Sequence, residues 1–350
     1  MEQRSRLDWV DACKALAIFA IYCGHFHTPD GRLEIFAYLY HLQLFFFLSG
    51  LFYFKLREKS FKELLLDRII KVLIPFMFFG LFNIIFFSLI KNFTAQEMWE
   101  QVIMLLEGVR STKFVASQIW FLTSIFCVQI IYYLLDRLIK IKSILLVISL
   151  VLLYVSNVMK PFSENLFFNV NTVLDYMFFF ALGDILYKWI RNFDYSLFKE
   201  KFKITIFTSS LFTIFISYLC FYYGVNFYQI FGLEVMTNKF LSYTFQLVIV
   251  LIIFIANIAA AHALCKSKLV VEIGKSTLIL MGVEMIIKQF TLHLVDVFGM
   301  KVNIINALEV IIFDVIIIIL AKIVFFKLFN EYIPWSTGKI SLKMKAITVS

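Results

Sequence analysis

The sequence predicts an all-α, polytopic membrane protein. Hydrophobic residues make up 61% of the 350-residue chain, charged residues make up only 16%, and the mean hydropathy is +0.87. Soluble domains carry about 25% charged residues, so this composition excludes an ordinary soluble domain. A hydrocarbon core about 30 Å thick needs about 20 apolar residues per helix, and the apolar residues here gather in runs of that length. We therefore expect a single integral membrane domain over residues 1–350.

The apolar runs predict about ten transmembrane helices. These lie near residues 10–26, 35–54, 72–90, 119–136, 143–159, 170–187, 204–223, 240–261, 269–292 and 303–326. No cleavage pattern of small residues follows the first run. We therefore expect that run to be retained as a helix rather than removed as a signal peptide.

Lysine and arginine residues are distributed unequally between the two sets of loops. Most of them fall in the loops on one side of the predicted spans, such as 55–71, 137–142 and 199–203. Cytoplasmic loops are enriched in these residues, so we expect both termini to be cytoplasmic and the protein to be multi-pass in the cell (cytoplasmic) membrane. This bias and the anionic lipid headgroups explain the net charge of +9, and we expect no nucleic-acid partner.

Two connecting segments have features of their own. Residues 55–71 place apolar side chains at helical spacing among basic ones, which predicts an amphipathic helix on the cytoplasmic surface. Residues 91–118 form a long loop on the outer side, in which Thr94 can cap a short helix from about 95 to 107. Trp120 follows, either as an anchor at the membrane interface or as a platform for a sugar.

Ionisable side chains in the first two apolar runs are the main functional candidates, because charged groups at membrane depth are costly. Lys14 and His25 are eleven residues apart, so a helix places them on one face, separated by roughly 16 Å along its axis. Asp11 lies one turn before Lys14, can pair with it and joins the same candidate binding site. This face suits a long substrate with an anionic head and a reactive tail. The structural alternative for Lys14 is a side chain that reaches to the membrane interface.

Charged and small residues in the later spans are expected to have structural roles. Gly183 permits close packing of its helix against a neighbour. Glu284 and Lys288 are four residues apart and could form a buried pair. Asp314 lies in a run of Ile and Val, so it must face the bundle interior or bind a partner such as Lys322.

Several classes of function lack their sequence signals. The chain has no Walker A loop, no GxGxxG fingerprint and no HExxH motif, so coupling to nucleotide hydrolysis is not expected. The five cysteines are scattered and form no CxxC pair. No Cys/His cluster has the spacing of a metal site, so we expect no bound metal.

A set of motifs spans most of the chain. They are Arg6, Asp11, Lys14, Gly24-His25, HLQLFFFLSG at 41–50, Asp67-Arg68, Pro75-Phe76, IWFL at 119–122 and IGKSTLIL at 273–280. In these motifs the sequence resembles the acyltransferase type 3 family, and within it the fucose 4-O-acetylase-like proteins, which are membrane enzymes that modify envelope sugars. Lys14 stands where the family commonly has Arg, which keeps the charge without the bidentate fork. Leu42-Gln43 replaces Met-Pro, and Glu284 stands at about the place of a family His.

The resemblance implies an acyl-CoA donor, acetyl-CoA, that enters from the cytosol and places its phosphates at Lys14 and Arg68. His25 would act as general base on an acceptor hydroxyl or carry the acyl group transiently, and imidazole suits proton transfer near neutral pH. His41 would orient the acceptor or stabilise charge. Ser49 would shape the helix or offer its hydroxyl to the thioester. The acceptor would be a hydroxyl of a glycan or lipid-linked saccharide at the outer face.

Other functions stay open at this point. A transporter or flippase of a lipid-linked glycan would also use many spans and intramembrane charges, although the sequence has no evident related halves. Binding of acetyl-CoA would distinguish an acyltransferase from such a transporter. A membrane sensor without turnover could keep the same fold. The sequence is compatible with a homo-oligomer, and it does not identify the acceptor sugar.

Overall fold

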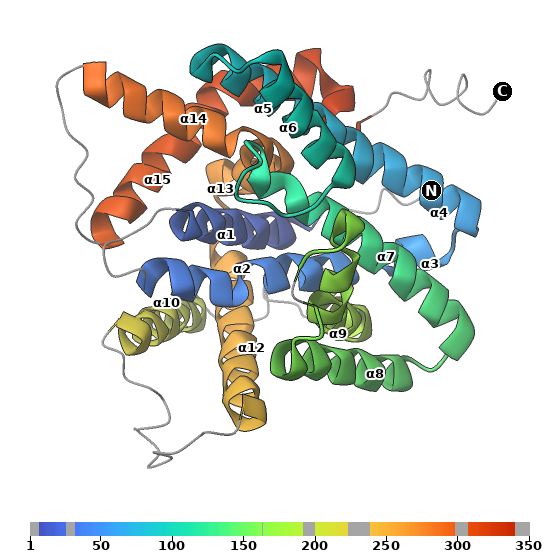
Figure 1. Ribbon diagram of the computed structural model, residues 1–350. Coiled ribbons are helices and arrows are strands. Elements are labelled where there is room, and N and C mark those ends of the chain that lie inside the picture. Colours follow the sequence, from blue (N-terminus) through green and yellow to red (C-terminus); the bar gives the residue numbers. More distant parts are fainter. Residues whose placement is uncertain are drawn as a thin grey trace.

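The computed structural model describes residues 7–25, 32–162, 164–191, 200–222, 239–297 and 307–339. Helices dominate these residues, and no strand occurs among them, so the all-α prediction is confirmed. α1 (Asp8–Gly24) and α2 (Arg32–Gly50) lie side by side in the centre of the bundle (Figure 1). Most side chains of α1 are buried, which fits its central position.

The other helices surround this central pair. They are α3 (Phe54–Arg57), α4 (Phe61–Arg68), α5 (Ile74–Lys91), α6 (Ala95–Glu107), α7 (Trp120–Ile139), α8 (Lys142–Tyr154), α9 (Val173–Arg191), α10 (Glu200–Tyr222), α12 (Lys239–Leu264), α13 (Lys268–Lys275), α14 (Thr277–Val297) and α15 (Ala307–Ala321). α1 packs against α12, α13, α14 and α15, while α2 packs against α9, α10 and α12. The residues carried by α1 and α2 are therefore positioned by helices from most of the chain.

Seven helices among the described residues are long and apolar enough to cross a membrane. They are Leu33–Gly50, Phe61–Lys91, Ser117–Ile139, Lys142–Met159, Phe167–Ile190, Lys239–Leu264 and Thr277–Leu294. These helices indicate a multi-pass membrane protein and correspond to seven of the predicted spans.

The three other predicted spans begin or end differently. α1 has 17 residues, the apolar stretch of α10 covers Lys203–Ile216, and residues 303–306 of the last predicted span lie outside the described residues. The count of ten therefore stays a prediction. So does the cytoplasmic location of both termini, because residues 1–6 and 340–350 also lie outside the described part.

α4 and α5 form one run of helix, Phe61–Lys91, through a π-helical turn at Ile69–Leu73. Ser60 begins this run in a capping box with Glu63. The segment predicted as an amphipathic helix near 55–71 thus contains α3, a short turn and the start of a long, membrane-length helix. Its location at the cytoplasmic surface stays a prediction.

α6 confirms the short helix predicted within residues 91–118. It runs from Ala95 to Glu107, with Thr94 as its cap. The backbone N–H of Glu97 donates to the Thr94 hydroxyl at 3.3 Å, and the backbone N–H of Thr94 donates to the Glu97 carboxylate at 2.8 Å. This reciprocal arrangement satisfies two donors that a helix start otherwise leaves unpaired.

The predicted span at 269–292 is two helices rather than one. α13 and α14 are separated at Ser276, whose conformation is no longer helical. α13 rests directly on α1, because a Cβ at Gly274 would lie 1.7 Å from the carbonyl oxygen of Asp11. The two backbones are therefore in direct contact, and residue periodicity gives no sign of this contact.

Asp314 lies buried on α15, in the bundle interior as predicted. The partner suggested for it was wrong, because the Lys322 ammonium lies 3.1 Å from the carboxylate of Glu272. Lys322 begins a π-helical turn after α15, and its side chain reaches α13 instead. The Asp314 carboxylate faces the thiol of Cys23, near the end of α1.

A network of ion pairs around two buried carboxylates joins α3, α7, α8 and α9. Arg57 donates to both oxygens of Asp136, at 2.7 and 2.8 Å, and to Asp184 at 2.9 Å. Tyr132 and Lys142 also donate to Asp184, each at 3.0 Å. Removing the partners of a buried carboxylate is strongly destabilising, so this network fixes how the four helices meet.

Glycine residues allow α2 and α9 to pack with their backbones in contact. A Cβ at Gly50 would lie 2.0 Å from the carbonyl oxygen of Phe180, and one at Gly183 would lie 2.2 Å from that of Phe47. The close packing predicted for Gly183 is therefore confirmed. Small residues are the usual means of bringing helices together in membranes, where there is no hydrophobic drive between them.

We expect Gly183→Ala to destabilise the protein, because the added methyl group would collide with the Phe47 carbonyl. Overpacking of this kind costs about 1–3 kcal/mol of folding free energy. Thermal unfolding in detergent, followed by tryptophan fluorescence, should show a lower Tm than the wild type. Gly24→Ala is the control, since its new methyl group would meet side chains rather than backbone, with Ala37 Cβ at 3.3 Å and the rings of Tyr38 and His41 at 3.9 Å. Equal Tm values for Gly183→Ala and the wild type would contradict the packing argument.

Candidate functional site

His25 is the first residue after α1 and caps that helix. Its backbone N–H donates to the carbonyl oxygens of Ile21 and Tyr22, both at 3.1 Å. Its ring Nδ1 lies 2.6 Å from Oε1 of Glu284 on α14, and the Lys288 ammonium donates to its carbonyl oxygen at 2.5 Å. The Glu284 side chain is 2% exposed, whereas that of His25 is 23% exposed. A buried carboxylate therefore holds one side of an imidazole whose other side stays accessible.

The carboxylate determines what this imidazole can do. When Nδ1–H is donated to Glu284, the neutral ring keeps its lone pair on Nε2, where it can accept a proton. The same carboxylate then stabilises the imidazolium that forms, as in other His–carboxylate pairs. The spacing of Glu284 and Lys288 suggested that they could form a structural pair, and in the structure each of them contacts His25. Glu284 is thus the functional candidate that the sequence interpretation missed.

His41 is buried on α2, and its Nδ1 lies 2.5 Å from the carbonyl oxygen of Ala37. A carbonyl oxygen can only accept, so Nδ1 carries the hydrogen and Nε2 of the neutral ring is an acceptor. The Tyr38 ring lies near both imidazoles, with its centre 6.1 Å from that of His25 and 5.3 Å from that of His41. The two histidines therefore belong to one site.

Both histidines line a pocket of about 380 Å³, here called the outer pocket. Its polar wall comes from Glu34, Tyr38, Arg110, Ser111, Thr112, Ser117 and Gln118. The Arg110 guanidinium lies over the ring of Trp120, 5.0 Å from its centre. Trp120 is 8% exposed and lines this pocket, whereas a side chain anchored in lipid would be more exposed. The role of Trp120 as a platform for a sugar stays a prediction.

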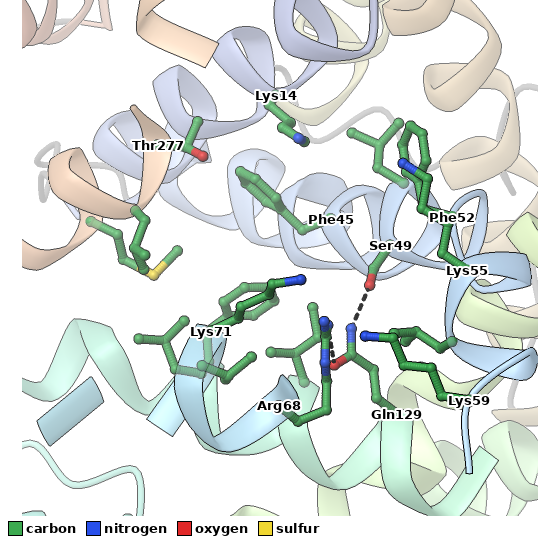
Figure 2. A pocket seen from close by; sticks show the side chains of 18 residues that line it. Lys14, Phe45, Ser49, Phe52, Lys55, Lys59, Arg68, Lys71, Gln129 and Thr277 are labelled. Atoms are coloured by element: carbon green, nitrogen blue, oxygen red, sulfur yellow. Dashed lines mark hydrogen bonds between the residues drawn. The ribbon is translucent and has the colours of Figure 1, made fainter. Parts of the chain in front are cut away.

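A second pocket, of about 570 Å³, lies beside the first half of α1 and is here called the inner pocket (Figure 2). Five basic side chains line it: Lys14, Lys55, Lys59, Arg68 and Lys71. Most of the remaining wall is apolar, from residues of α2, α3, α7, α14 and the π-helical turn at Ile69–Leu73. A largely apolar cavity with several cations suits a molecule that combines phosphate groups with an uncharged arm.

Polar side chains form a row along one wall of the inner pocket. Arg68 donates to the amide oxygen of Gln129 at 3.2 Å, and the amide nitrogen of Gln129 donates to the hydroxyl of Ser49 at 2.9 Å. Figure 2 shows this row, with Lys14 and Thr277 at the opposite side of the pocket. Ser49 therefore orients Gln129, and Gln129 orients the guanidinium.

One carboxylate organises three of the five cations. Asp67 forms an ion pair with its neighbour Arg68 and lies 2.6 Å from the Lys59 ammonium and 2.7 Å from the Lys71 ammonium. The π-helical turn at Ile69–Leu73 lies between Arg68 and Ile74 and contains Lys71, and such turns are frequent at functional sites. The pocket keeps an excess of positive charge, because the single negative charge of Asp67 cannot neutralise three cations.

The predicted site residues are divided between the two pockets. Lys14, Ser49 and Arg68 line the inner pocket, and His25 and His41 line the outer pocket. Asp11 lies 3.5 Å from the Lys14 ammonium, as predicted, but its carboxylate is buried beside the inner pocket rather than in its lining. Lys14 and His25 thus face two pockets rather than one cavity. Phe121 and Met281 line both pockets, so the two pockets lie next to each other.

The cations of the inner pocket are the groups that could hold an anionic cofactor. Within the described ranges, no group of three or more His, Cys, Asp or Glu side chains is placed to hold a metal ion.

Comparisons with known proteins identify the family. The model of the acyltransferase domain of the acyltransferase type 3 family matches residues 7–326, nearly the whole chain. No curated protein and no solved structure matches the chain. The matched range includes both pockets and all seven membrane-length helices. The chain therefore belongs to the acyltransferase type 3 family and is a multi-pass membrane acyltransferase.

Proposed function

We propose that the protein is an O-acyltransferase that moves an acetyl group from cytosolic acetyl-CoA to a sugar hydroxyl of an envelope or exported polysaccharide. The observation that carries this proposal is the pair of pockets along α1, one rich in cations and one containing two imidazoles, with Phe121 and Met281 in common. The donor and the acceptor would approach from opposite sides of the membrane. The acetyl group then passes between them within the protein.

The inner pocket is the proposed donor site. Coenzyme A carries phosphate groups at one end and a thiol at the other, joined by a long uncharged arm. Lys14 and Arg68 line this pocket with three further lysines, and charge-assisted hydrogen bonds to phosphate are among the strongest that side chains make. The arm would follow the apolar wall towards Phe121 and Met281, which brings the thioester to the boundary of the outer pocket. Asp11 would act by holding Lys14 in place.

The outer pocket is the proposed acceptor site. A sugar has hydroxyl groups along its edge and an apolar face, and Ser111, Thr112 and Gln118 could bind the former while Trp120 stacks on the latter. The saccharide would be a glycan or a lipid-linked precursor in the cytoplasmic membrane, consistent with the fucose 4-O-acetylase-like resemblance. Lipid surrounds the helices that carry both sites.

The chemistry follows from the two imidazoles. Nε2 of His25 takes the proton from the acceptor hydroxyl as its oxygen attacks the thioester carbonyl carbon, with Glu284 stabilising the imidazolium. A new C–O bond forms, the C–S bond breaks, and the CoA thiolate receives the proton from His25. In His41, Nδ1–H is donated to the Ala37 carbonyl, which leaves Nε2 as a hydrogen-bond acceptor. An acceptor can orient the hydroxyl of the sugar, but it cannot donate a hydrogen bond to the developing oxyanion.

The transporter alternative differs from this proposal in one measurable property. A pure transporter of a lipid-linked glycan needs no acyl donor, so the purified wild type would show no affinity for acetyl-CoA. We expect calorimetry to detect acetyl-CoA binding. We also expect mass spectrometry of surface glycans to show acetyl esters in cells that contain the protein and their loss in cells without it. Glycans that are equally acetylated in both would refute the proposed function.

We expect Glu284→Gln to lower the transfer rate by about 10²–10⁴-fold, the contribution typical of general acid–base catalysis. The amide keeps the size of the side chain but removes the negative charge that supports the His25 imidazolium. The measurement is the initial rate of CoA thiol release in the presence of acceptor, with acetyl-CoA affinity as a check on folding. Glu331→Gln, at an exposed site, should behave as the wild type. A Glu284→Gln protein with more than a tenth of the wild-type rate would remove Glu284 from the mechanism.

We expect Arg68→Gln to raise the KM for acetyl-CoA at least about 10-fold, since a charge-assisted hydrogen bond contributes about 1.5–3 kcal/mol. The KM for acetyl-pantetheine, which lacks the nucleotide phosphates, should change far less. Comparing the two donors separates loss of phosphate binding from general damage to the pocket. Lys62→Gln removes a nearby exposed cation outside the pocket and should leave both values unchanged. Equal losses for the two donors would show that Arg68 does not bind phosphate.

A further inference from the structure

Two side chains lie at the boundary between the two pockets, because they line both of them. Phe121 on α7 and Met281 on α14 line both pockets, and they are only 5% and 4% exposed. Under the proposed function, the acyl group must pass this boundary, because the phosphate-binding cations lie on one side of it and His25 lies on the other. The space around Phe121 and Met281 therefore limits what can be transferred.

Phe121 forms the fixed side of the boundary. Its ring packs edge-on against Phe46, with centres 5.2 Å apart, and at a tilt against Phe45, with centres 5.7 Å apart. Phe46 in turn stacks on Tyr176 at 4.4 Å. A ring held by other rings from α2 and α9 has little freedom to move aside for a larger substrate.

Met281 combines a fixed backbone with an adaptable side chain. The carbonyl oxygens on either side of it are both occupied, since Tyr22 donates to that of Leu280 at 2.9 Å and Asn83 donates to that of Gly282 at 2.7 Å. The thioether side chain is unbranched and has three rotatable bonds, so it can turn without any change in the helix. Met281 can therefore make way for a small group while α14 stays in place.

The register of α14 places this boundary close to the reacting atoms. Leu278 lines the inner pocket, Met281 lines both pockets, and Met285 lines the outer pocket, so one stripe of the helix passes from one to the other. Glu284, which binds His25, is three residues beyond Met281, a rise of about 4.5 Å. An acyl carbonyl next to His25 therefore has its alkyl tail within reach of Met281.

We infer that Phe121 and Met281 set the length of the acyl group that the protein transfers and restrict it to the shortest chains; this inference rests on the proposed function. The thioester sulfur lies on the inner side and the attacking hydroxyl on the outer side, so the alkyl tail must point sideways into the boundary. A methyl group fits beside the turned Met281 side chain. Each further methylene has to displace the ring of Phe121, which its neighbours hold in place.

The test compares acetyl-CoA with butyryl-CoA as donors for the purified full chain in lipid nanodiscs. The acceptor is the saccharide pool extracted from the envelope of the source cells, and the esters formed are quantified by mass spectrometry. We expect the wild type to prefer acetyl-CoA in kcat/KM, and Met281→Ala to reduce that preference at least about 10-fold, because one methylene in a tight apolar pocket accounts for about 10–200-fold. Phe121→Leu should shift the preference in the same direction.

Two residues of the same stripe of α14 provide matched controls. Leu278→Ala enlarges only the inner pocket and Met285→Ala only the outer pocket, so neither should change the preference by more than about twofold. Calorimetric binding of CoA confirms that each variant is folded. If Met281→Ala does not bind CoA, the donor preference of Phe121→Leu is used alone to test the inference.

The possible failures are distinguishable. If the wild type forms acetyl esters but the folded boundary variants keep its donor preference, the inference is overturned and the proposed function stands. A wild type that uses butyryl-CoA as well as acetyl-CoA overturns the inference in the same way. If the wild type forms no ester from either donor, the proposed function is overturned and this inference with it.

Discussion

The hydrogen bond between His25 and Glu284 joins two helices that are distant in sequence and fixes the imidazole at the edge of the outer pocket. It ties the end of α1 to the middle of α14, 259 residues further along the chain. A carboxylate buried in a membrane bundle needs such a partner, because its desolvation is otherwise uncompensated. The second tie, from Tyr22 to the Leu280 carbonyl, lies one turn away and fixes the same register. The alignment that orients the imidazole therefore also places Met281 at the boundary of the pockets.

Two of the charged clusters among the described residues differ in their balance of charge. Arg57 with Asp136 and Asp184 forms a closed network in which each carboxylate has several donors, and this network holds helices together. The cations of the inner pocket outnumber their carboxylate partners and border an open cavity. This difference in charge balance distinguishes a structural site from a binding site, although both use the same residue types.

Much of this organisation can be predicted from the sequence. Composition and apolar run length indicate the membrane class, and the capping signal at Thr94 locates α6 to the residue. The ionisable residues of the first runs identify His25, Lys14 and His41, because such residues are rare at membrane depth. Each of these predictions depends on local pattern, which a single sequence contains in full.

The remainder depends on contacts between distant segments. The spacing of Glu284 and Lys288 suggested a pair along one helix, and only the packing of α14 against α1 brings them to His25. The one signal for Glu284 was its place at a position where the family often has His. Lys14 and His25 were expected on one helix face, and helical spacing cannot show that they line two different pockets. Residue periodicity likewise cannot show the break at Ser276 or the backbone contact between Gly274 and α1.

The position of Asp67 among three cations has a consequence for the shape of the inner pocket. Lys59, Arg68 and Lys71 would repel one another if no anion were near, and that repulsion would spread the walls of the pocket apart. Asp67 supplies a counter-charge that belongs to the protein, so the cavity keeps its shape. An anionic ligand of this pocket would meet the carboxylate as well as the cations, so Asp67 would weaken the retention of such a ligand.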